Sequence, residues 1–175
     1  MKMFTVVASL LVLLAAGCAS QPPAPIRVDL PTDLQIGQVL QAPDNYQGSK
    51  VRWGGVIANI TNLKSETELE VVAKPLDKSA RPVIDSKSSG RFLVRISGFL
   101  EPTEFTANRE ITVVGQVSGA EARPIGEFNY TYPLIQADSY HLWEGRVEPV
   151  YYYYDPWFYD PWYWGYPRYP WWYYY

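Results

Sequence analysis

Cys18 is the residue whose chemistry the sequence defines best. It is the only cysteine in a chain of 175 residues, so an internal disulfide is excluded. It follows Lys2 and an apolar run over residues 3–16. This run of 14 residues is shorter than the roughly 20 that a membrane-spanning helix needs. A basic start, a short apolar run and small residues before the cysteine are together typical of a signal peptide.

The segment LAAGC at residues 14–18 resembles the lipobox of bacterial lipoproteins, with Ala15 where Leu is commoner. In that motif the thiol receives a diacylglyceryl group, the peptide is cut before the cysteine, and the new amine is acylated. Two lipid signals already give stable anchoring, at about 0.8 kcal/mol per buried methylene. We therefore expect acylated Cys18 to be a permanent anchor in outer-membrane lipid. No Asp follows the cysteine, a pattern that resembles sorting to the outer membrane. The maturation and sorting machinery for lipoproteins are then expected partners.

Two other groups of residues invite a catalytic interpretation. Asp138, Ser139 and His141 include the only histidine, but residues two apart on a strand project side by side, and no nucleophile elbow precedes them. One histidine and one lipidated cysteine are too few for a nitrogen and sulfur metal site. Glycine-rich nucleotide motifs are absent as well. We therefore expect no enzyme activity, no metal and no cofactor, with His141 a partly exposed strand residue.

Three carboxylates alternate along one segment, at Glu66, Glu68 and Glu70. Period-two spacing places them on one face of a strand, opposite Leu69 and Val71. No complementary carboxylate group for acid and base catalysis is identifiable elsewhere. We interpret them as a solvated strand face.

The charge balance argues against one class of partner. After removal of the signal peptide, 14 basic residues remain against 18 acidic ones, a net charge of about −4. Nucleic-acid binding relies on Lys and Arg to neutralise phosphates. We therefore predict no nucleic-acid partner.

Composition divides the chain into four parts. Residues 1–17 form the lipoprotein signal peptide, and residues 18–35 the lipidated N-terminus and a tether. Four prolines between residues 19 and 33 predict an extended tether that lets the domain stand off the bilayer. Residues 36–148 are the domain, and residues 149–175 are a tail rich in Tyr, Trp and Pro.

The domain carries the composition of β-strands after one short helical turn that ends before Pro43. Gly54 and Gly55 interrupt the first strand, and we expect a phase switch there, with Val56, Ala58 and Ile60 sharing the new face. Gly115 indicates a second bend. The expected strands lie at residues 50–63, 69–73, 91–97, 111–119 and 128–143, the last broken near Pro133. If the barrel has a functional loop, its length indicates the polar connection over 75–90.

Glycine-bent strands favour a closed sheet, because bending lets one strand serve both sides and closure removes exposed edges. The predicted fold class is all-β, a small OB-like antiparallel β-barrel of five or six strands with a non-strand insert after the third. An open β-sandwich of the same strands is the alternative.

Several segments together resemble the Slp family, the starvation-inducible outer-membrane lipoproteins of Gram-negative bacteria. They occur in the family's order and spacing and cover roughly residues 36–146. The segments are RWGGVIANITN, TELEVVAKPLD, GRFLVRISGFLEP, ITVVGQVSGAE, IGEFNYTYPLI and HLW.

The resemblance implies an outer-membrane lipoprotein linked to stationary phase, starvation or acid stress, facing the periplasm, and transfers no catalytic residue. Trp53 and Trp143 are expected to pack in the core or at its rim. Two functions remain open. The first is a non-catalytic envelope component that binds a neighbouring lipid surface, glycan or protein through barrel and tail. The second is an OB-type module that binds a soluble oligosaccharide or other small ligand on its strand face.

The tail contains 17 aromatic residues within its last 25 positions. Its prolines disfavour strand pairing, and its rings suit a bilayer headgroup region, a sugar or a protein surface. A tail that completes the barrel is the structural alternative. The candidate membrane or glycan contacts are Trp157, Trp162, Trp164, Trp171 and Trp172.

Overall fold

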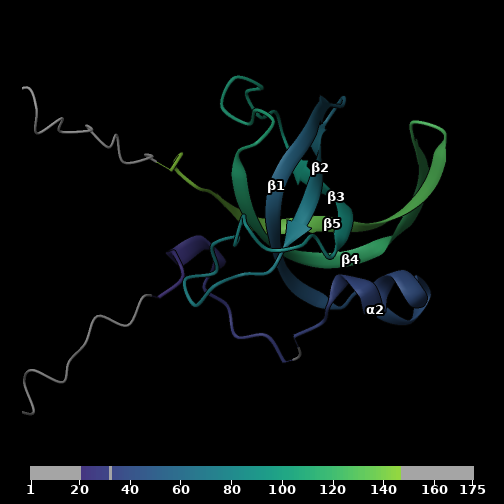
Figure 1. Cartoon of the computed structure of the whole chain (residues 1–175), viewed down its shortest axis with the longest axis horizontal. Helices are drawn as coiled ribbons and strands as arrows, with labels where there is room; N and C mark the ends of the chain where they lie inside the picture. The colour runs from purple at the N-terminus through teal and green to yellow at the C-terminus, as the bar shows by residue number, and fades with distance from the viewer. Residues whose placement is uncertain (1–20, 32, 147–175) are drawn as a thin grey trace, which may run out of the picture. The chain divides into compact units, whose positions relative to one another are not determined.

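The computed structural model describes residues 21–31 and 33–146 (Figure 1). Short helical segments precede the strands, and none of the helices within these ranges is long and apolar enough to cross a membrane. The elements are η1 (Ala24–Ile26), α2 (Ile36–Gln41), η2 (Pro43–Tyr46), β1 (Lys50–Asn62), β2 (Glu66–Lys74), β3 (Gly90–Ser97), β4 (Glu110–Ile125) and β5 (Phe128–Leu142). The all-β class and the short helix before Pro43 are confirmed.

The five strands form a closed barrel in the order β1-β2-β3-β5-β4, with β4 paired back to β1. The prediction of a wholly antiparallel sheet is wrong, because β3 and β5 run parallel where Leu93–Arg95 face Leu134–Gln136. The strand pairs joined by one connection, β1–β2, β2–β3 and β4–β5, are all antiparallel. The β3–β5 pair is joined through β4, and such a non-sequential pair has no turn in the sequence that fixes its direction.

The core fills the barrel with side chains that alternate along each strand. Trp53 packs edge-on against Phe92, with ring centroids 5.5 Å apart, and its Nε1 donates to the Leu34 carbonyl at 2.7 Å. Helix α2 adds Ile36 and Val39 to the same cluster. Its first turn is closed by reciprocal hydrogen bonds of Gln35 and Gln38, which satisfy free N–H groups. The interpretation of Trp53 as a core residue is confirmed.

The glycines of β1 act differently from the prediction. Buried positions continue with unchanged alternation through the pair to Ile57, and the register shift against β2 lies between Ile57 and Asn59. A Cβ on Gly55 would lie 2.0 Å from the Val72 carbonyl oxygen. The glycines are therefore required by close contact with neighbouring backbone, and the bulge that changes the phase follows them.

Strands β4 and β5 form the longest hairpin of the sheet. Gly115 sits at a register shift, as the predicted bend requires, and a Cβ there would lie 2.2 Å from the Gln136 carbonyl oxygen. The predicted break near Pro133 is absent, since β5 runs without interruption through Pro133, which pairs with Ala120. A register shift between Val117 and Gly119 lies next to this pair, the irregular setting in which proline is tolerated in a sheet.

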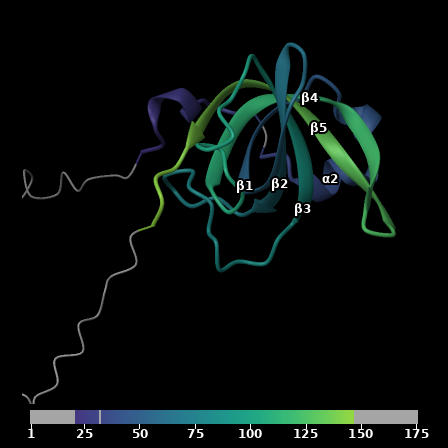
Figure 2. The ribbon, with the colours of Figure 1, turned by 90° about the horizontal axis from the view of Figure 1, so that it is seen from above.

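The outer part of this hairpin, residues 119–133, is called the arm below. It leaves the barrel as a curved two-stranded ribbon, seen on the right of both views (Figures 1 and 2). Its turn uses Gly126, whose φ of +60° is a conformation that glycine adopts without strain. Phe128 beside the turn is 67% exposed.

Candidate functional site

The segment after the predicted lipidation site lies on the barrel. We call residues 22–31 the strap. Ile26, at the end of η1, is fully buried against Ala80 and Val114, and Trp143 packs on the same cluster. The prediction of an extended tether is therefore wrong for this stretch, because Ile26 is buried between β4 and the β2–β3 connection.

Hydrogen bonds hold the strap at both sides of Ile26. Arg52 on β1 donates from Nη1 to the carbonyls of Ile26 and Val28, each at 3.3 Å. Ser139 on β5 donates its hydroxyl to the Pro25 carbonyl. Proline-rich backbone has few donors but keeps its carbonyls, and polar side chains of the barrel bind these acceptors.

The last residues of the barrel are fixed at the same place. The Trp143 backbone N–H donates to the Glu110 carbonyl at 2.9 Å, and its indole Nε1 donates to Thr112 Oγ1 at 3.0 Å. Arg81 lies over the indole ring, 5.3 Å from its centroid, and donates to the Glu144 carbonyl at 2.8 Å. The strap and residues 139–145 thus meet at one end of the barrel, which we call the termini end.

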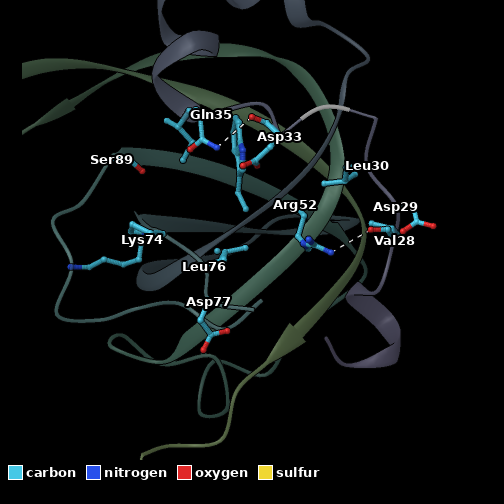
Figure 3. Close-up of a pocket in the computed structure, with 14 residues that line it drawn as sticks. Val28, Asp29, Leu30, Asp33, Gln35, Arg52, Lys74, Leu76, Asp77 and Ser89 are labelled. Carbon is cyan, nitrogen blue, oxygen red and sulfur yellow. Dashed lines mark hydrogen bonds between the residues drawn. The ribbon is translucent and has the colours of Figure 1, made fainter. Parts of the chain in front are cut away.

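A cavity of about 530 Å³ lies beside the strap (Figure 3). In Figure 3, Leu76 points inward and the Arg52 guanidinium borders the space, whereas the charged ends of Lys74, Asp77 and Asp29 point away from it. The lining residues are Val28, Asp29, Leu30, Asp33, Gln35, Ile36, Arg52, Trp53, Gly54, Lys74, Pro75, Leu76, Asp77 and Ser89.

The polar groups around the cavity have mostly structural partners. Lys74 Nζ donates to the Ser86 carbonyl at 2.6 Å. Burial alone would raise the pKa of Asp77, but the hydrogen bonds that Oδ1 accepts from Ser79 and from the Arg81 backbone together hold this pKa below its ordinary value. The cavity is large enough for a small ligand. Its lining mixes polar and apolar side chains, with the Arg52 guanidinium at its border, an arrangement suited to binding.

The Ser139 and His141 pair does not form a catalytic site. Ser139 uses its hydroxyl on the strap, as described above, and His141 packs edge-on against Trp143 with ring centroids 4.5 Å apart. His141 is partly exposed, as predicted. Within residues 21–31 and 33–146, no group of three or more His, Cys, Asp or Glu side chains is placed to hold a metal.

The carboxylates of β2 are not a solvated face, contrary to the sequence prediction. Glu68 is only 6% exposed and accepts two hydrogen bonds from Arg123 of the arm, at 2.6 and 2.9 Å. Arg95 of β3 adds a third contact to Glu68 at 3.2 Å. Glu121 of the arm accepts from Arg123 at 2.8 Å, and this bond lowers the pKa of Glu121.

A second contact joins the arm to the barrel one step along the strands. The Tyr132 hydroxyl donates to Glu70 Oε1 at 3.0 Å, and Arg91 pairs with the same carboxylate. Tyr132 and Leu93 are each only 2% exposed. The arm therefore covers the outer face of β2 and β3. The alternation at 119–125 and 128–133 could have indicated a hairpin, but no sequence signal shows on which surface it folds.

Most of the predicted site residues lie outside the part of the chain that the structure describes. Cys18 and the tail residues Trp157, Trp162, Trp164, Trp171 and Trp172 lie outside the described residues. Trp143, predicted to pack in the core or at its rim, does so at the termini end. The docked strap and the folded-back arm are the structural elements that sequence reasoning missed.

Comparison with known proteins gives consistent matches. An uncharacterized lipoprotein YeaY of Escherichia coli K12 is 33% identical over 168 residues, 92% of this chain and 84% of the relative. The outer membrane protein Slp of the same organism is 33% identical over 135 residues, 76% of this chain and 71% of the relative. An uncharacterized protein of Haemophilus influenzae is 46% identical over 94 residues, about half of each chain.

The family comparison covers nearly the whole sequence. The description "Outer membrane lipoprotein Slp family" matches residues 15–173. Together with the relatives, this match confirms the resemblance noted from the sequence and the localisation as a lipid-anchored outer-membrane protein. The chain belongs to the outer membrane lipoprotein Slp family.

Proposed function

We propose that the protein is a non-catalytic component of the cell envelope, anchored through acylated Cys18, that binds an envelope neighbour through its barrel and its aromatic tail. Its domain faces the periplasm, and its expression is linked to stationary phase or starvation stress. It requires no cofactor. The lipoprotein maturation and sorting machinery are its partners during export.

The barrel is of the OB type in this proposal. The closed order β1-β2-β3-β5-β4, the bent first strand and the non-strand insert after β3 support this assignment. OB barrels commonly bind ligands on the outer face of strands 2 and 3. Here the arm covers that face through Arg123 and Tyr132, so another surface must make the contact.

The position of the two chain ends on the barrel supports the bilayer as the tail's contact. The strap, which continues back to Cys18, and residues 139–145, which continue forward to the tail, meet at the termini end. Lipid anchor and tail are therefore attached at one end of the barrel. Tryptophan and tyrosine favour the headgroup region, where an apolar body and a polar tip are both satisfied. We assign this contact to Trp157, Trp162, Trp164, Trp171 and Trp172.

The test compares the acylated full-length protein with a variant lacking residues 150–175, both in phospholipid vesicles. Five of the seven tryptophans lie in the tail, so tryptophan fluorescence reports mainly on it. We expect brominated lipids to quench most of the full-length signal and little of the signal from the deletion variant. Unquenched tail fluorescence that shifts on adding peptidoglycan fragments would favour a glycan neighbour, and no response to either would refute the tail assignment.

The alternative function, a small-ligand module, is favoured by the cavity beside the strap. Its volume of about 530 Å³ lies in the range of ligand sites, and Arg52 borders it. Because the arm covers the outer face of β2 and β3, this alternative places the ligand in the cavity and not on the sheet. A soluble oligosaccharide that binds equally well with and without residues 150–175 would support the alternative over a tail-mediated contact.

A further inference from the structure

We propose that the termini end of the barrel rests directly on the phospholipid headgroups, with the arm directed away from the membrane. This orientation rests on the proposed acylation of Cys18 but not on the tail's contact. It follows from how the strap is held and from how few residues separate the strap from Cys18.

The docked strap leaves a short connection to the membrane. A tether over residues 18–33 would span up to about 50 Å when extended, at 3.3–3.6 Å per residue. The strap is held by buried Ile26, by Arg52 and by Ser139. Arg27 also donates from Nε to the Pro22 carbonyl at 3.0 Å. Only four peptide links then separate Cys18 from Pro22, with a reach of about 14 Å.

A reach of this size fixes which surface meets the bilayer. The acylated cysteine lies at the level of the headgroups, so Pro22 and the neighbouring termini end must lie within about 14 Å of them. The small barrel cannot turn over on so short a link without detaching the strap. In both views η1 and the arm lie on opposite sides of the barrel (Figures 1 and 2), so the arm tip with exposed Phe128 faces away from the membrane.

Charge makes a small contribution to this orientation. Arg27 in the strap and Lys78 near Ala80 are exposed and can reach phosphates. Exposed Asp29, Asp77 and Glu144 belong to the same region. Because both signs are present, the link rather than electrostatic attraction holds the orientation. We therefore expect it to persist in high salt, which screens exposed charges beyond about 3 Å at 1 M.

The chain offers a clean way to test the orientation, because its only cysteine is the acylated one. Lys78→Cys at the termini end and Glu127→Cys at the arm tip each add one free thiol at an exposed position. Each acylated full-length variant carries an environment-sensitive fluorophore in phosphatidylethanolamine and phosphatidylglycerol vesicles with headgroup-attached quenchers. We expect the probe at 78 to be quenched at least threefold more than the probe at 127, with or without 1 M salt.

A linker variant provides the control. Twenty Gly and Ser residues inserted between Ser20 and Gln21 should reduce quenching at position 78 to the level at 127. Equal quenching at the two positions without the insertion, or no effect of the insertion, would overturn the orientation. Repeating the measurement without residues 150–175 separates the proposals, because quenching at 78 should survive that deletion. If Cys18 is not acylated, each variant carries a second labelled thiol, at Cys18, and the protein fails to float with vesicles.

Discussion

Gly55 has no room for a side chain. A Cβ there would lie 2.0 Å from the Val72 carbonyl oxygen and 2.8 Å from its carbonyl carbon, which are backbone atoms of the paired strand. Relief requires a shift of β1 against β2. We expect Gly55→Ala to lower the free energy of unfolding by about 2–3 kcal/mol or more, at the upper end of overpacking changes, as measured by urea denaturation.

Gly37 provides the matched control, because a Cβ there meets nothing within 4 Å and the residue lies in α2. Gly37→Ala should leave stability unchanged or raise it by up to about 1 kcal/mol, since alanine favours helix. Equal losses in the two variants would contradict the packing argument. The sequence predicts that the glycine pair matters but not why, because a close approach between strands involves a partner 17 positions away.

A substitution at Ile26 can show how much the strap contributes to stability. The side chain is fully buried, and the strap holds few other apolar contacts. We expect Ile26→Ala to lower the free energy of unfolding by about 2–4 kcal/mol if the strap unfolds together with the barrel. Leu30→Ala, at a partly buried position, should cost less. A loss confined to proteolytic sensitivity near residue 26, with unchanged global stability, would instead show that the strap opens separately.

Glu68 tests the arm in the same way. The carboxylate is almost fully buried and binds Arg123 and Arg95. Glu68→Gln removes the buried anion between the two guanidinium groups and leaves them only more exposed carboxylates such as Glu121. We therefore expect a loss of about 1–3 kcal/mol and faster amide hydrogen exchange in the arm. Glu66 makes one contact at 3.6 Å and is more exposed, so Glu66→Gln should cost under about 1 kcal/mol. Unchanged exchange in Glu68→Gln would mean that the arm is held by packing alone.

Acid should loosen the arm through Glu121. Its pKa is lowered from 4.5, mainly by the hydrogen bond from Arg123. A carboxyl with a lowered pKa in the folded state stabilises that state above the ordinary value, and the contribution is lost as pH falls through the folded value. The urea midpoint should therefore hold from pH 7 to about 5 and fall below about 4.5. In Glu121→Gln the fall should be smaller, and an identical fall would assign the effect to other carboxylates.

The strands could be predicted from the sequence, but the positions of the strap and the arm on the barrel could not. Alternation and glycine spacing predict the five strands because those signals are local. Four prolines around a single Ile26 have the composition of a linker, and only the partner cluster of Ala80 and Val114 reveals that it docks. Likewise, alternating Glu68 and Glu70 resemble a solvent face until Arg123, 55 residues distant from Glu68, is placed over them. Both errors come from contacts between distant segments.

At the scale of the whole molecule, the core described within residues 21–146 is closed without the tail. Every strand has two hydrogen-bonded neighbours, and Trp143 seals the small cluster around Ile26. If the tail serves the membrane, deleting residues 150–175 should leave both the urea midpoint and its m-value unchanged in detergent-free soluble protein lacking the signal peptide and Cys18. The m-value scales with the surface exposed on unfolding, so it reports whether the tail belongs to the cooperative unit. A fall in both quantities would show that the tail completes the barrel, and its tryptophans would then be core residues rather than a membrane contact.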